Sequence, residues 1–180
     1  RLAWSRQRDP EDGCAVLGRT LVETGTFNAD DAWPVLRVAL EMNRPRVARA
    51  VAALVSPGVG KAMDELLDNP VRYLRRHAGS GRHQGELALL AVIRAATSDP
   101  DAAAALMDER WHNALGPDRA AWAWAVIGKQ AAMRLSIDAP QYYKRAFTTL
   151  RGSPRAAQWS DEMLAWGVRS AVPRNRHASL

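Results

Sequence analysis

Apolar residues recur along most of the chain at intervals of three and four positions, the spacing that places them on one face of a helix. Proline and glycine cut this pattern into short pieces, and several pieces open with Asp or Asn beside a proline, as helix N-termini do. No stretch alternates convincingly enough for a strand. The pattern predicts helices over residues 10–24, 29–42, 47–55, 61–68, 70–77, 82–97, 102–115, 118–135, 139–150 and 154–171.

The connections between these helices are short, which favours antiparallel packing of consecutive helices. We therefore expect an all-α fold of about nine or ten helices. Its expected arrangement is an irregular α-superhelix, an α-solenoid of stacked antiparallel helical hairpins. The predicted organisation is an N-terminal extension over 1–9, one superhelical domain over 10–171 and a flexible C-terminal tail over 172–180.

The 180-residue chain has a net charge of +6, which on its face favours an anionic partner. Most of this positive charge lies at the two ends of the sequence. Residues 1–10 contain three Arg and one Asp, and residues 172–180 contain two Arg. Residues 11–171 therefore hold a net charge of only +2. Nucleic-acid binding would rest on charge alone, and the sequence does not favour it.

Cys14 is the only cysteine, so the sequence has no internal disulfide and no cysteine-based zinc site. Cys14 is either a buried thiol or half of a bridge to a cysteine that is missing here. His77 and His83 flank a glycine turn at a spacing that does not suit a metal on one helix face, so we expect solvated histidines. No run of about 18 apolar residues occurs, so no membrane span is expected.

Arg72, Arg75 and Arg76 form a basic run on one face of the predicted helix 70–77. Such a face could bind a phosphate or a glycan-linked carboxylate through its guanidinium groups. The alternative is a solvated face whose cations offset the dipole at a helix C-terminus, and the sequence favours this alternative.

Trp122 and Trp124 project about 200° apart on one predicted helix, so they cannot form a single stacking platform. We expect Trp122 in the core, and Trp124 either against a neighbouring hairpin or on the concave face, where its indole could cover the C–H face of a sugar. Core packing is the favoured role for both. The same holds for Trp111, Trp159 and Trp166.

No carboxylate stands in a recognisable catalytic setting. The sequence also lacks a phosphate-binding loop, a nucleophile elbow and a His-Glu-x-x-His motif. No residue pattern indicates a cofactor. The residues alone therefore favour a binding or scaffolding module over a catalyst.

Several runs resemble, in their order and spacing, the superhelical region of soluble lytic murein transglycosylases. These periplasmic enzymes cleave peptidoglycan glycan strands and form 1,6-anhydro-muramoyl ends. The resemblance covers about residues 6–171. It is carried by Arg8–Cys14 with Leu17, Gly25 with Asp30–Trp33, Leu67–Pro70, Trp122–Ala132, Tyr142-Tyr143 and Gln158–Arg169.

In that family the helices form a ring beside a separate lysozyme-like domain, which carries the catalytic Glu in a Glu-Ser motif followed later by Gly-Leu-Met-Gln. Neither motif occurs here, so the resemblance implies a chain that lacks the catalytic domain. It also implies that Cys14 pairs with a cysteine of an upstream helix. After residue 171 the sequence departs from the family pattern.

We therefore expect a periplasmic, monomeric, non-catalytic segment that helps to position peptidoglycan glycan strands for a catalytic domain outside this chain. The candidate glycan or anion contacts are Arg72, Arg75, Arg76 and Trp124. No cofactor, metal or nucleic-acid partner is expected. The alternative is a helical-repeat scaffold that binds a protein segment along its concave face.

Overall fold

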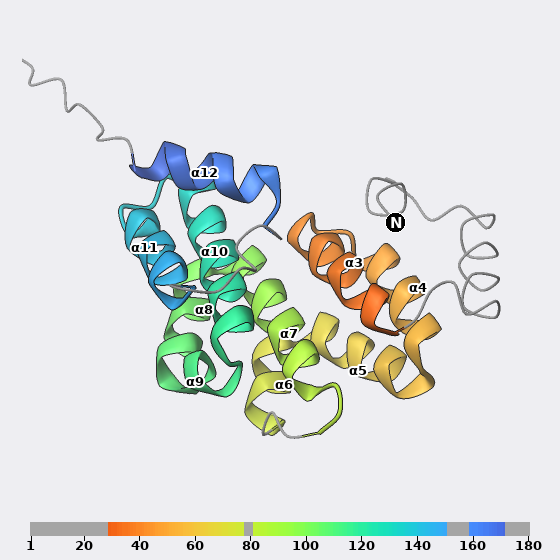
Figure 1. Cartoon of the computed structure of the whole chain (residues 1–180). Helices are drawn as coiled ribbons and strands as arrows, with labels where there is room; N and C mark the ends of the chain where they lie inside the picture. The colour runs from red at the N-terminus through yellow and green to blue at the C-terminus, as the bar shows by residue number, and fades with distance from the viewer. Residues whose placement is uncertain (1–28, 78–80, 151–158, 172–180) are drawn as a thin grey trace, which may run out of the picture.

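The computed structural model describes residues 29–77, 81–150 and 159–171, and every regular element within them is a helix (Figure 1). The predicted all-α fold is confirmed. The described residues form nine helices when α8, the π-helical turn η1 and α9 are taken as one continuous helix. The elements are α3 (Ala29–Glu41), α4 (Pro45–Val55), α5 (Pro57–Asp68), α6 (Pro70–Arg76), α7 (Gln84–Ser98), α8 (Pro100–Leu106), η1 (Met107–Trp111), α9 (His112–Ala114), α10 (Pro117–Met133), α11 (Ala139–Thr149) and α12 (Asp161–Ala171).

Side-chain caps and prolines begin several of these helices. Ser56, Asn69 and Asp99 cap α5, α6 and α8, each accepting hydrogen bonds from backbone N–H groups of the first turn. The predicted start of α5 is wrong. The sequence pattern predicted a break at Ser56 and a helix that begins only at Lys61. The helix begins earlier, at Pro57, since proline at the first helical position loses no hydrogen bond.

The helix predicted over 102–115 also differs in detail. It begins two residues earlier, at Pro100, and it contains the π-helical turn Met107–Trp111. A π turn inserts an extra residue into the helical ladder and is frequently found at functional sites. Apolar spacing does not reveal such a turn, because the pattern on either side remains helical.

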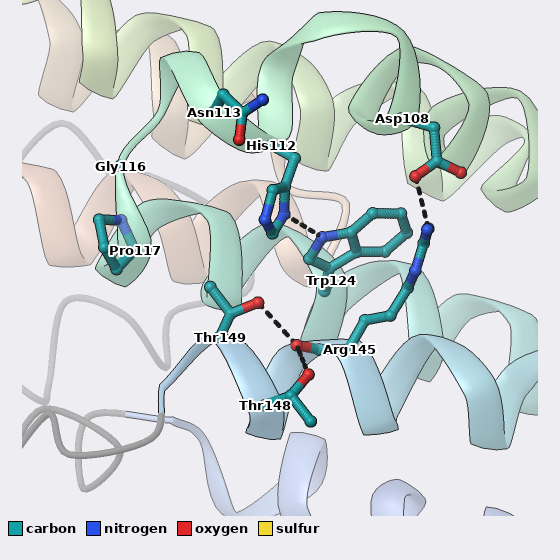
Figure 2. Close-up of a pocket in the computed structure, with 9 residues that line it drawn as sticks. All are labelled: Asp108, His112, Asn113, Gly116, Pro117, Trp124, Arg145, Thr148 and Thr149. Carbon is teal, nitrogen blue, oxygen red and sulfur yellow. Dashed lines mark hydrogen bonds and ion pairs between the residues drawn. The ribbon is translucent and has the colours of Figure 1, made fainter.

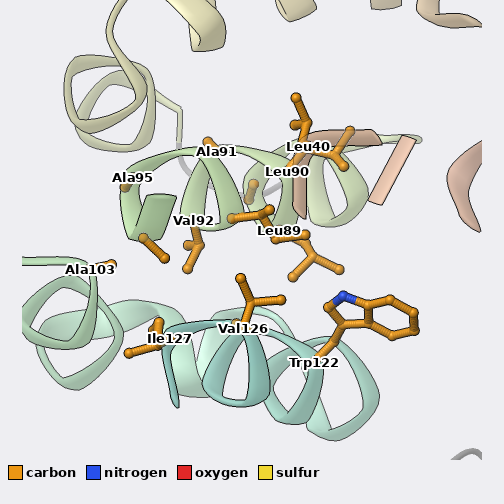
Figure 3. Packing of buried hydrophobic residues seen from close by; sticks show 14 of the residues in the cluster. Leu40, Leu89, Leu90, Ala91, Val92, Ala95, Ala103, Trp122, Val126 and Ile127 are labelled. Carbon is orange, nitrogen blue, oxygen red and sulfur yellow. The ribbon is translucent and has the colours of Figure 1, made fainter. Parts of the chain in front are cut away.

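Two central helices, α7 and α10, hold the described chain together. α7 packs against α3, α5, α6, α8 and α10, and α10 packs also against α8, α9, α11 and α12. Leu89 and Val92 of α7 face Val126 and Ile127 of α10 across the core (Figure 3). Both helices are buried on nearly all sides, so hydrophobic burial here joins elements from both halves of the chain.

Consecutive helices pack against one another through most of the described chain, as stacked hairpins do. The helix α3 also packs directly against α7, beyond its neighbour in sequence. The superhelical arrangement stays a prediction, and so do the proposed domain boundaries.

A buried charge network joins α3, α10 and α12. Lys129 Nζ of α10 donates to Glu41 Oε1 at 3.0 Å and to Glu162 Oε2 at 2.8 Å. Ser160 Oγ donates to the same Glu41 oxygen at 3.0 Å. The side chains of Lys129 and Glu41 are only 3% and 2% exposed. Each charge therefore depends on the other to offset the loss of its hydration.

Tyr143 of α11 fills a slot between two glycines beside this network. A Cβ atom added to Gly128 would lie 2.8 Å from the Tyr143 ring, and one added to Gly167 would lie 3.2 Å from it. The hydroxyl donates to the Met163 carbonyl oxygen at 2.9 Å. Burial, and then the nearby carboxylates, raises the pKa of Tyr143. The slot thus fixes how α11 packs on α10 and α12.

No described helix is long and apolar enough to cross a membrane. Several predictions fall outside the described residues: the helix over 10–24, Cys14, the extension over 1–9, the tail over 172–180 and the start of the helix predicted from 154.

Candidate functional site

A pocket of about 640 Å³ opens between η1, α9, α10 and α11 (Figure 2). We call it the Trp124 pocket. Gly116, with a φ of 74°, lets the chain turn sharply from α9 into α10 beside it. Its lining residues are Asp108, His112, Asn113, Gly116, Pro117, Trp124, Arg145, Thr148 and Thr149.

Trp124 forms the buried wall of this pocket and is only 1% exposed. Its indole Nε1 donates to His112 Nδ1 at 3.0 Å. The Arg145 guanidinium lies over the ring, 4.3 Å from the centroid, and the Tyr142 ring stacks on it with centroids 5.9 Å apart. The indole therefore presents no open face to a sugar, and it acts on the pocket by holding His112 and Arg145.

The hydrogen bond from Trp124 fixes the tautomer of the neutral His112 side chain. Because Nδ1 accepts this bond, the neutral imidazole carries its proton on Nε2. The His112 side chain is exposed and lines the pocket, so its Nε2–H is a donor held in a defined orientation.

Arg145 and Asp108 join the two sides of the pocket. Arg145 Nη1 lies 2.7 Å from Asp108 Oδ1, and both side chains are partly exposed. Asp108 belongs to the π turn and Arg145 to α11, so the pair bridges the pocket between these elements. A guanidinium with one edge on a carboxylate keeps further N–H groups for a ligand oxygen.

Two threonines supply acceptors. The Thr148 hydroxyl donates to the Lys144 and Arg145 carbonyl oxygens, and the Thr149 hydroxyl donates to the Arg145 carbonyl oxygen. Each hydroxyl proton is thus engaged within α11, which leaves the oxygen atoms able to accept from a ligand. The pocket combines fixed donors with fixed acceptors, the chemistry that a hydroxyl-rich ligand requires.

Tyr142 holds the Trp124 ring from α11. Its hydroxyl donates to Asp101 Oδ1 of α8 at 2.9 Å, which ties α11 to α8. Burial raises the pKa of Tyr142 to about 12, and the hydrogen bond to Asp101 adds to the effect. The phenol is therefore neutral at ordinary pH and can donate this bond.

The predicted basic run lies elsewhere. Arg72, Arg75 and Arg76 are exposed on α6, and none of them lines the Trp124 pocket. Arg72 Nη2 forms an ion pair at 2.8 Å with Asp68, the last residue of α5. Arg75 and Arg76 lie in the last turn of α6, where cations are favourable. An anion-binding role for the three stays a prediction.

Metal ligands do not gather in the described part of the chain. No group of three or more His, Cys, Asp or Glu side chains there is placed to hold a metal ion. His77 Nε2 lies 3.8 Å from Glu65 Oε2, and His83 lies against the Trp33 ring with centroids 5.2 Å apart.

The sequence analysis named Trp124 as a candidate glycan contact, but it did not identify the residues that lie beside Trp124 in the pocket. Asp108, His112 and Arg145 were not singled out from the sequence. Trp111, Trp122 and Trp159 are buried as predicted, and Trp166 is partly buried against the core.

Comparison with known proteins found no matching family model, no matching curated protein and no matching solved structure.

Proposed function

We propose that this chain is a non-catalytic helical segment of a periplasmic soluble lytic murein transglycosylase. In this proposal it binds peptidoglycan glycan strands at the Trp124 pocket and presents them to a catalytic domain outside this chain. The observation that carries the proposal is the pocket itself, where Trp124 holds His112 and Arg145 in fixed positions. The sequence resemblance supplies the class of ligand.

The chemistry of the pocket suits a glycan strand. Sugar hydroxyl groups both donate and accept, and the pocket offers donors on His112 and Arg145 and acceptors on Asp108 and the two threonines. Peptidoglycan also carries carboxylates, for which a guanidinium is the preferred partner. A binding role needs no further group in the pocket.

The residues that line the Trp124 pocket do not supply the two carboxylates with which most glycosidases cleave a glycosidic bond. Asp108 is the one carboxylate among the described lining residues, and it is paired with Arg145 and partly exposed. A general acid at neutral pH needs an apolar enclosure that raises its pKa. The pocket is therefore proposed to retain the strand and not to cleave it.

Co-sedimentation with purified sacculi tests the binding role. We expect Arg145→Gln to weaken binding by about tenfold, since it removes a charged hydrogen-bonding group. Arg49→Gln is the matched control, because Arg49 is an exposed arginine of α4 that pairs with Asp64 at 2.8 Å, far along the chain from the pocket residues. Equal binding by Arg145→Gln and the parent chain would contradict the proposal.

Digestion of the same sacculi tests the absence of catalysis. We expect no release of 1,6-anhydro-muropeptides by the isolated chain. Release above the level of a blank incubation would overturn the non-catalytic assignment, even if binding is found.

A second candidate function is a scaffold that binds a protein segment. It is favoured by Leu164 and Val168, which are exposed one turn apart on α12. Capture from a cell lysate, compared with binding to sacculi, separates the two functions. Protein capture that is lost in Leu164→Ser and unchanged in Arg145→Gln, without sacculus binding, would favour the scaffold.

A further inference from the structure

The Trp124 pocket contains a histidine, a residue type that ordinarily gains or loses a proton between pH 5 and 8. The His112 side chain is exposed, so a proton from water can reach it. Its Nδ1 atom accepts the hydrogen bond from Trp124 Nε1 at 3.0 Å, as Figure 2 shows. This hydrogen bond is possible only while Nδ1 carries no proton.

Protonated His112 cannot keep the bond to Trp124. An imidazolium carries a proton on both ring nitrogens and has no acceptor, and an indole N–H is a donor only. Two N–H groups would then face each other with their nitrogen atoms 3.0 Å apart. The arrangement in the structure therefore belongs to the neutral form of His112.

The two rings differ in how easily they can move apart. Trp124 is only 1% exposed and contacts the Arg145 guanidinium and the Tyr142 ring. His112 is exposed at the edge of the pocket, where water can hydrate an imidazolium. We therefore expect His112 to turn outward when it is protonated, which removes its Nε2–H from the pocket and the acceptor from Trp124.

Charged neighbours of His112 occur in pairs of opposite sign. Asp108 of η1 and Arg145 of α11 line the pocket with His112 and form an ion pair at 2.7 Å. Glu109 and Arg110 precede His112 on its own helix. These pairs leave no net charge that would hold His112 in one protonation state.

The other neighbours of His112 are neutral or line a different cavity. From α10, Pro117 and Trp124 line the pocket without charge, whereas Asp118 lines a separate cavity beside α3 and α7. From α11, Tyr142 is neutral because burial raises its pKa to about 12. Among the described lining residues, His112 is thus the residue type whose charge ordinarily changes between pH 5 and 8.

We propose that protonation of His112 switches the Trp124 pocket off, so that the pocket binds its glycan ligand more weakly at pH 5 than at pH 8. The class of ligand rests on the proposed function, whereas the switch is a property of the chain without ligand. The sign of the effect is specific. If an imidazolium stayed in the pocket, its charge would strengthen the binding of a ligand carboxylate at pH 5.

The indole N–H signal of Trp124 in ¹H–¹⁵N spectra of the full chain without ligand tests the switch. Trp124→Phe assigns this signal, and His112→Asn assigns the ring signals of His112. Between pH 8 and pH 5 we expect the Trp124 signal to move toward the position of an N–H without an acceptor, in step with the titration of His112. Circular dichroism at each pH defines the range over which the helices remain intact, and the comparison is made within that range.

His112→Asn is the matched variant, because an asparagine oxygen can accept from the Trp124 N–H and does not titrate. We expect its Trp124 signal to be independent of pH. The histidines at 77 and 83 remain in this variant, so any change that it still shows does not come from His112.

Binding of soluble glycan fragments at pH 8 and pH 5 tests the consequence of the switch. We expect the affinity of the parent chain to fall by about tenfold at pH 5, the loss of one hydrogen-bonding group, and that of His112→Asn to stay the same. The carboxylates of the ligand titrate equally in both experiments, so the difference between the two chains reports on His112.

A Trp124 signal that stays in place while His112 titrates, or a His112 that does not titrate down to pH 5, would overturn the switch. Binding by the parent chain that is equal or stronger at pH 5, relative to His112→Asn, would overturn it as well. Absence of glycan binding at pH 8 would contradict the proposed function alone, because the step in the Trp124 signal without ligand would still support the switch.

Discussion

Lys129 is a single residue on which the packing of three helices depends. Its ammonium group lies between Glu41 of α3 and Glu162 of α12, and the Lys129 and Glu41 side chains are almost completely buried. One Glu41 oxygen, Oε2, is buried without a partner in the described part of the chain. The network therefore has no spare donor to take over from Lys129.

Lys129→Met should strongly destabilise the fold, because it leaves the Glu41 carboxylate buried without its counter-charge. We expect a loss of about 3–5 kcal/mol in the free energy of unfolding, measured with urea. Arg49→Met breaks an exposed ion pair and should cost less than about 1 kcal/mol. Equal costs for the two would mean that the buried network does not support the fold.

Gly128→Ala should destabilise the chain despite the higher helix propensity of alanine. The new Cβ would lie 2.8 Å from one edge of the Tyr143 ring. Gly167 packs so close to the other edge that a Cβ there would lie 3.2 Å from the ring, which limits how far the ring can move away. Overpacking of about 1–3 kcal/mol then exceeds the gain of about 1 kcal/mol from propensity. Gly58→Ala in α5, whose Cβ would meet no atom closer than 3.8 Å, should be neutral or stabilising by the same denaturation measurement. A stable Gly128→Ala would contradict this account of the slot.

The local sequence specifies the start of a helix better than any other feature of that helix. The cap and proline pair at 69–70 predicted the start of α6, because a cap acts on N–H groups within three residues. The pair at 99–100 begins α8 two residues before the start predicted at 102. The pair at 56–57 was interpreted as a break, since Ser-Pro-Gly is equally typical of a loop. The π turn η1 depends on packing beyond its own sequence, so apolar spacing could not predict it.

Asp99→Ala should shorten or loosen α8. Asp99 Oδ1 accepts from the N–H groups of Asp101 and Ala102, and alanine cannot replace these bonds. We expect a cost of about 1 kcal/mol, read from the shift in the denaturation midpoint. Asp99→Asn keeps an acceptor and should cost much less. Similar costs for both would show that the cap does not stabilise the helix.

The arrangement of the whole molecule depends on contacts far apart in sequence. Lys129 and Glu41 are 88 residues apart, and α7 packs on helices from both halves of the described chain. Periodicity predicts which face of a helix is buried, but it does not say which helix covers that face. For the same reason the sequence predicted a role for Trp124 without indicating that Asp108 and Arg145 would meet beside it.

All three tyrosines of the chain should resist ionisation in the folded state. Burial raises the pKa of Tyr73 and of Tyr142 from 10.0 to about 12, and it raises that of Tyr143 as well. In the unfolded chain these phenols lose their protons near pH 10, so their contribution to stability is complete below that pH. It is lost as the pH rises toward 12.

An alkaline titration followed by phenolate absorbance and circular dichroism measures this effect. We expect no phenolate signal near pH 10, and a rise in absorbance that coincides with the loss of helicity at higher pH. A phenolate signal near pH 10 with the helical spectrum intact would contradict the burial of these side chains.

The central claim is that the Trp124 pocket binds glycan, and the indole N–H signal of Trp124 in a ¹H–¹⁵N NMR spectrum reports on it most directly. The chain has seven tryptophans, so the signals can be resolved, and Trp124→Phe assigns the one required. With soluble glycan fragments from purified sacculi, we predict a saturable shift of the Trp124 signal that is lost in Arg145→Gln and kept in Arg49→Gln. A Trp124 signal that stays in place, or that shifts equally in Arg145→Gln, would contradict the account.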